Sequence, residues 1–135
     1  MKSSIKETVQ RAVLAAVLLT GGAGLAAAHH SYAAFDMTTQ KVISGTVVKV
    51  NWTNPHCWVW LDVPNEQGAA ETWGVEGMSP NFLARRGWSR TTIKPGDKLS
   101  ITMHPAKDGT KGGAWVTAKR PSGETLVMGG AITNP

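Results

Sequence analysis

Two neighbouring stretches decide the fold, GTVVKVNW at residues 45–52 and HCWVWLDV at residues 56–63. Within each stretch the character of the side chains alternates from one residue to the next. A period of two is typical of a β-strand with one buried face. The residues between them, TNP at 53–55, predict a turn, because asparagine favours turns and proline cannot donate a hydrogen bond to a neighbouring strand. The two stretches therefore indicate a pair of adjacent strands.

The alternation also assigns side chains to the two faces of each strand. On the first strand, one face is expected to carry Thr46, Val48, Val50 and Trp52. On the second strand, one face is expected to carry Cys57, Val59, Leu61 and Val63, and the other His56, Trp58, Trp60 and Asp62. Cys57 lies within an apolar run, so we expect a buried, inert thiol, the alternative being a reactive one.

The remaining elements include one short helix. Residues 71–77 are expected to form a third strand, and residues 98–104, 114–119 and 125–128 three more. Between the third and fourth strands, a helix is expected at residues 81–86, with Ser79 as N-cap, Pro80 in the first helical position, Arg85 and Arg86 in the last turn, and Gly87 at its end.

The order of these elements predicts the fold class. Three strands, a short helix and further strands are the order of an OB-fold, a partly open Greek-key barrel. We therefore predict an all-β protein with one short helix, built as a small OB-fold-like Greek-key barrel of five to six strands. An immunoglobulin-like sandwich is the alternative, and it would need about seven strands and no central helix.

The first 28 residues have the features of a cleaved signal peptide. A basic start is followed by the apolar stretch AVLAAVLLT at 12–20, by glycines and by Ala26-Ala27-Ala28. An uncleaved membrane anchor is the alternative, but a spanning helix needs about 20 apolar residues. We expect a protein exported to the bacterial periplasm, with no stable membrane insertion after cleavage. Residues 29–44 would then be an extended segment, 45–130 the barrel and 131–135 a tail.

Composition narrows the classes of partner. The 135-residue chain carries 14 Lys and Arg against 9 Asp and Glu, a formal charge of +5. These charges are spread along the chain without a basic run, so a nucleic-acid partner is not expected. The single cysteine excludes an internal disulfide framework and a zinc site built from several cysteines.

The four histidines, His29, His30, His56 and His104, suggest a metal site. After cleavage His29 would be the first residue, so its amine and imidazole together can chelate Cu(II), which favours square-planar sites rich in nitrogen. In an OB-fold, His56 and His104 lie at strand ends that would approach this terminus. Met103 beside His104 would then add a thioether, the type of ligand that Cu(I) favours.

Each histidine also has a purely structural interpretation. His29 and His30 would be polar residues of the terminus, or would anchor the terminus on the barrel. His56 would be a turn histidine bonded to the backbone, and Met103 would pack in the core beside a structural His104. The sequence leaves these alternatives open beside the copper hypothesis.

Trp58 and Trp60 suggest a second kind of site. Two residues apart on one strand, they share a face, and OB-folds bind ligands on the face of their second and third strands. An indole stacked on a flat ring contributes about 1–3 kcal/mol, and it would also suit a sugar ring. The alternative is that both side chains cover the open end of the barrel, pack under the N-terminal segment or fill the core.

Signatures of an enzyme are missing from the sequence. No serine lies in a Gly-x-Ser-x-Gly motif, and GTKGG at residues 109–113 lacks the Gly-Lys-Ser/Thr of a phosphate-binding loop. We therefore expect a small binding protein and no catalytic activity. Copper is the favoured ligand, and the alternative is a module that binds a small ligand or a periplasmic protein through its tryptophan face.

Several short stretches together carry a resemblance to a known family. They are His29-His30-Ser31, Phe35-Asp36, Gly45-Thr46-Val47, Trp52-Thr53-Asn54-Pro55-His56, Trp73-Gly74-Val75-Glu76, Gly87-Trp88, Pro95-Gly96-Asp97, and Pro105 with Asp108-Gly109. The chain resembles a family of small exported bacterial proteins known as domain of unknown function 6152. The resemblance implies export and one domain over nearly the whole mature chain, and it implies no activity.

Overall fold

The structure, a computed structural model, describes residues 32–129. The predicted leader, His29, His30 and the tail at 131–135 lie outside these residues. The chain divides into two units between Ala33 and Ala34, and the barrel belongs to the second. No helix within residues 32–129 is long and apolar enough to cross a bilayer.

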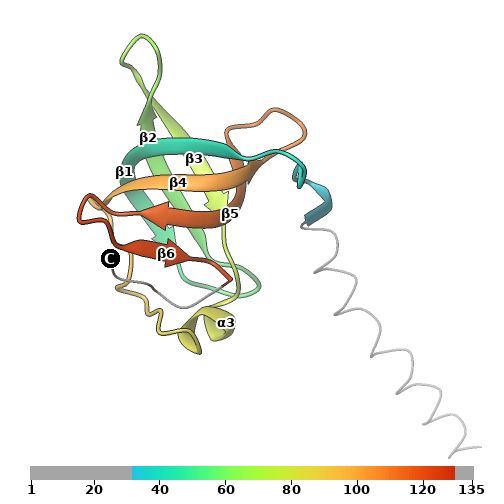
Figure 1. The fold of residues 1–135 in the computed structure, drawn as a ribbon, viewed down its shortest axis with the longest axis vertical. Helices are drawn as coiled ribbons and strands as arrows, with labels where there is room; N and C mark the ends of the chain where they lie inside the picture. Colours follow the sequence, from blue (N-terminus) through green and yellow to red (C-terminus); the bar gives the residue numbers. More distant parts are fainter. Residues whose placement is uncertain (1–31, 130–135) are drawn as a thin grey trace, which may run out of the picture. The chain divides into compact units, whose positions relative to one another are not determined.

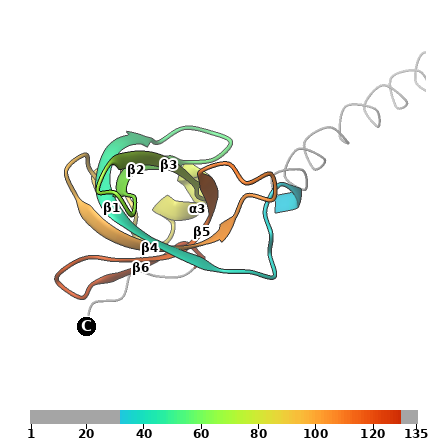
Figure 2. The same ribbon diagram turned by 90° about the horizontal axis from the view of Figure 1, so that it is seen from above.

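The second unit is a small barrel with one helix (Figure 1). Its elements are β1 (Lys41–Asn51), β2 (Trp58–Pro64), β3 (Ala70–Glu76), α3 (Pro80–Ala84), β4 (Lys98–Pro105), β5 (Gly112–Lys119) and β6 (Thr125–Val127). The sheet order is β3-β2-β1-β4-β5-β6, and a parallel pairing of β3 with β5 closes the ring. Figure 2 shows the ring from above, with α3 at its far end. The predicted OB-fold-like barrel with one short helix is confirmed.

Strand β1 is longer than predicted and changes face along its length. It begins at Lys41 and pairs with β4 through its first half and with β2 through its second half. A bulge between Val47 and Lys49 shifts the register against β2. As a result Val47 is 1% exposed and Val48 is 43% exposed. The prediction that Thr46 and Val48 share a face with Val50 was wrong, because a bulge inverts the alternation on one side of it.

Strand β2 confirms its predicted alternation. Cys57 just before the strand and Val59 and Leu61 within it are buried in the core, and Val63 packs against the core. The same core contains Met103, whose side chain is fully buried. The interpretation of Met103 as a core residue is therefore confirmed.

Helix α3 covers one end of the barrel, as Figure 1 shows. The Ser79 side chain accepts a hydrogen bond from the Phe82 N–H, and Leu83 is buried against the core. The helix ends at Ala84, so the predicted extent to residue 86 was too long and no basic residue lies in its last turn. Arg86 lies beyond the helix and donates hydrogen bonds to the carbonyl oxygens of Phe82 and Gly129.

The bulge predicts effects of very different size for substitutions at two neighbouring valines. Val47→Ala should lower the free energy of unfolding by about 2 kcal/mol, because it removes two buried carbon groups and leaves a cavity. Val48→Ala, the matched control, should change it by less than about 0.5 kcal/mol, because its side chain is largely exposed. Urea unfolding of both variants checks this. A larger loss for Val48→Ala would contradict the observed register.

Candidate functional site

Trp58 and Trp60 lie on the outer face of β2. Their indoles are nearly parallel, with ring centroids 5.9 Å apart and planes at 21°. Both side chains are half-buried, whereas the intervening Val59 is buried on the inner face. The alternative that the two tryptophans fill the core is therefore excluded.

Gly74 of β3 gives these indoles the space they occupy. It pairs with Trp60, and a Cβ built on Gly74 would lie 3.0 Å from Trp60 Nε1 and 3.7 Å from Trp58 Cζ3. Such distances are close to or below ordinary van der Waals contact. The missing side chain thus allows both rings to lean over β3.

A hollow of about 410 Å³ lies beside the indoles. Because β3 runs between β2 and β5, Trp58 and Trp60 form one side of the hollow, Thr72 and Gly74 lie between, and residues 110–113 form the other side. Phe35 and Ala106 complete its lining. The hollow is open to solvent and combines aromatic surface with backbone and hydroxyl groups.

A short segment before β1, residues 34–39, is fastened to the barrel beside this hollow. The Asp36 N–H donates to the Pro105 carbonyl oxygen at 2.8 Å, and the Lys107 N–H donates to the Ala34 carbonyl oxygen at 2.9 Å. Between these bonds Phe35 is 6% exposed and pairs with Ala106. The segment therefore fixes an aromatic side chain at the edge of the hollow.

His104 and Asp36 hold the other end of this segment. His104 Nδ1 lies 2.7 Å from the Thr39 carbonyl oxygen, and since a carbonyl only accepts, Nδ1 carries the proton. The hydroxyl groups of Thr38 and Thr39 donate to the Asp36 carboxylate and lower its pKa to about 2. His104 thus has a structural contact in this part of the chain.

His56 contacts a carboxylate instead of the backbone. Its Nδ1 meets Glu76 Oε1, and the two side chains are 22% and 11% exposed. Because the Glu76 carboxylate occupies Nδ1 of His56, a metal would bind at the other ring nitrogen, Nε2. Glu76 belongs to the stretch Trp73-Gly74-Val75-Glu76, but its contact with His56 was not predicted, because only the register of β2 against β3, which pairs Trp58 with Glu76, brings the two side chains together.

Polar and cationic groups surround the tryptophan pair. Lys49 Nζ lies over the Trp60 ring, 4.7 Å from its centroid. The Thr72 hydroxyl donates to Asp62 at 2.9 Å. Lys111 Nζ lies 2.9 Å from Glu71 Oε1, and this contact is the main cause that lowers the pKa of Glu71.

A metal centre is not assembled by residues 32–129 themselves. Within that range no group of three or more His, Cys, Asp or Glu side chains is close enough to hold an ion. His56 lies in the loop before β2 and His104 lies on β4, and these two strands are not neighbours in the sheet. Ala114 of β5 lies between Glu76 and His104 and pairs with both. His29 and His30 lie outside the described residues.

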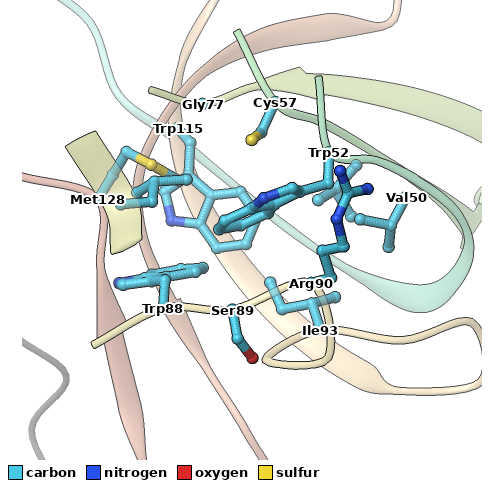
Figure 3. A pocket seen from close by; sticks show the side chains of 12 residues that line it. Val50, Trp52, Cys57, Gly77, Trp88, Ser89, Arg90, Ile93, Trp115 and Met128 are labelled. Carbon is cyan, nitrogen blue, oxygen red and sulfur yellow. The ribbon is translucent and has the colours of Figure 1, made fainter. Parts of the chain in front are cut away.

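Inside the barrel, a small cavity of about 20 Å³ lies near α3 (Figure 3). Most of its lining is apolar, including Cys57, Trp52, Trp88 and Trp115, and Ser89 and Arg90 also line it. Its volume is that of about one water molecule. Burial raises the pKa of the Cys57 thiol to about 11, and the predicted burial of this residue is confirmed.

The sequence of this chain matches a known family. The profile of DUF6152, a family of unknown function, matches residues 16–117. The match covers more than half of the chain, so the protein belongs to DUF6152, as the resemblance predicted. No curated protein and no solved structure gives a significant match to the chain.

The buried thiol predicts a loss of stability at high pH. The folded Cys57 keeps its proton up to about pH 11, whereas the unfolded thiol loses it near pH 9. Between these values the unfolded state releases the proton first, so the free energy of unfolding should fall as the pH rises. Urea unfolding from pH 8 to 10.5 should show a steeper fall for the native protein than for Cys57→Ala. Equal slopes would contradict the assignment.

Proposed function

We propose that this protein is an exported binding module that holds a small ligand on the face of Trp58 and Trp60. The position of Trp58 and Trp60 carries the proposal, because two nearly parallel indoles on an outer strand face line an open hollow of about 410 Å³. The leader-like residues 1–28 support export to the periplasm. A periplasmic protein that presents a small flat group is the alternative occupant.

Preformation of the site supports binding as its role. The two indoles stack on each other and lean over the bare backbone of Gly74, and Lys49 lies over the Trp60 ring, so they are already ordered before a ligand arrives. A preorganised aromatic surface loses little entropy on binding. We propose binding without catalysis, because the lining residues of the hollow contain no nucleophile next to a general base.

The proposal predicts where ligands bind. In a nuclear magnetic resonance screen of the processed protein with a library of small flat molecules, the indole N–H signals of Trp58 and Trp60 should shift most. Trp58→Ala and Trp60→Ala should each weaken binding of a hit about tenfold, the loss of one stacking contact.

The control for this screen is Val42→Ala, which changes an outer residue of β1 that is 64% exposed and lies outside the hollow. This variant should bind like the native protein. Shifts confined to other parts of the barrel, or equal weakening by all three variants, would contradict the assignment of the site.

Copper binding by the new N-terminus is a second candidate function. It is supported by His29 and His30 directly after the expected cleavage site, and by the contact of His56 Nδ1 with Glu76. Histidines that bind metals commonly donate their other ring N–H to a carboxylate. In this proposal His29 is the main ligand, and His30, His56 or His104 completes the set.

The copper proposal predicts one Cu(II) per correctly processed chain. His29→Ala, or a form whose terminal amine is acetylated, should weaken Cu(II) binding at least tenfold in titration calorimetry, because each disrupts the chelate of amine and imidazole. Electron paramagnetic resonance should show nitrogen ligands in the native protein only. Unchanged affinity in both variants would rule out His29 as the main ligand.

A further inference from the structure

Cations gather at one end of the barrel, although the sequence contains no continuous basic run. Residues 50–84 contain four acidic residues and no lysine or arginine, whereas residues 85–94, the basic segment, contain four cations and no acidic residue. These cations are Arg85, Arg86, Arg90 and Lys94. Because the basic segment directly follows α3, it lies at the end of the barrel that α3 covers (Figure 1).

Buried side chains hold the basic segment in place. Trp88 and Ile93 within it belong to the buried core. Arg85, Arg90 and Lys94 are exposed. Because the apolar side chains of the segment face the core, its charged side chains face the solvent. The cations are therefore presented from a fixed backbone.

The carboxylates beside the basic segment do not neutralise it. Arg120 donates a hydrogen bond to the Thr92 carbonyl oxygen at the base of the segment. Its Nη1 lies 3.0 Å from Asp97 Oδ2, and its Nε lies 2.7 Å from Glu124 Oε2. These three charged groups together carry a charge of −1, so the basic segment leaves an excess of +3 at this end.

The charges of the basic segment have no anionic partner within residues 32–129. Arg85, Arg90 and Lys94 form no ion pair with that part of the chain. Arg86 contacts two backbone carbonyl oxygens and a phenyl ring, none of which carries a formal charge. The four cations therefore remain available to an anionic partner.

The same end of the barrel lacks an exposed apolar anchor. The large apolar side chains exposed within residues 32–129 are Tyr32, Met37, Val42 and Val48, and all of them precede β2. The core of a specific protein interface is mostly apolar. An acidic bilayer needs no such anchor, because its negative surface potential attracts lysine and arginine near the headgroups. The guanidinium group of arginine also matches the oxygens of a phosphate.

We propose that the α3 end of the barrel is a peripheral membrane-binding surface, on which the basic segment contacts the phosphate groups of an acidic bilayer. The contact is electrostatic, and no part of the barrel enters the hydrocarbon. It places α3 towards the bilayer and the hairpin between β2 and β3 away from it (Figure 1). This inference is independent of the tryptophan face and of the copper proposal.

Co-sedimentation of the processed full chain with lipid vesicles tests this inference. Vesicles of equal parts phosphatidylglycerol and phosphatidylcholine should bind the protein at low salt, and vesicles of phosphatidylcholine alone should not. Arg85→Gln, Arg90→Gln and Lys94→Gln should each weaken binding about fivefold, and the triple variant about a hundredfold. Salt should release the protein, because the screening length falls from about 10 Å at 0.1 M to about 3 Å at 1 M.

Two control variants separate this surface from the net charge of the protein. Lys107→Gln removes an exposed cation from the loop between β4 and β5 and should weaken binding less than about twofold. Glu66 is exposed on the hairpin between β2 and β3. Combining Arg85→Gln with Glu66→Gln keeps the native net charge, and this variant should bind as weakly as Arg85→Gln alone.

Three results would overturn the proposal. The first is equal binding to vesicles with and without phosphatidylglycerol, or to neither. The second is native binding by the variant that combines Arg85→Gln with Glu66→Gln, because net charge alone would then explain the attraction. The third is binding of a soluble oligoglutamate, lost in the triple variant, by a protein that does not sediment with acidic vesicles. The basic segment would then contact an acidic protein.

Discussion

The parallel pairing of β3 with β5 is the interaction on which the rest of the structure depends, because it closes the sheet into a barrel. Glycine makes this pairing possible. A Cβ at Gly112 would lie 2.7 Å from the Gly74 carbonyl oxygen, and a Cβ at Gly113 would collide with the carbonyl oxygen of His104. Side chains here would force the strands apart and leave unpaired edges, which invite association with other chains.

The same pairing shapes the candidate site. Because β3 joins β5 at Gly74, the outer faces of β2, β3 and the start of β5 form one continuous surface, on which the hollow lies. The backbone of Gly74 contributes to barrel closure, because its N–H donates to the Lys111 carbonyl oxygen at 3.0 Å. Its missing side chain contributes to the site, because it leaves space for the two indoles. Barrel closure and the tryptophan surface therefore meet at the same residue.

Sequence patterns predicted the features that depend on a single strand, such as which of its side chains face the core. The alternation through Leu61 was sufficient for β2, since this strand pairs with β3 without a register shift. The bulge after Val47 and the contact between His56 and Glu76 arise from how the strands pair with one another. The residue pattern within a single strand does not reveal this pairing. The attachment of Phe35 beside the hollow likewise depends on a partner, Ala106, far along the chain.

The six tryptophans form two groups: four pack in or against the core of the barrel, and two do not. Trp52, Trp88 and Trp115 lie together at the α3 end, where Trp88 packs edge-to-face on Trp115, and Trp73 packs against the core beneath Lys41. Trp58 and Trp60 do not belong to the buried core. Polar side chains would satisfy an outer strand face, so the buried core does not require two neighbouring indoles at these positions.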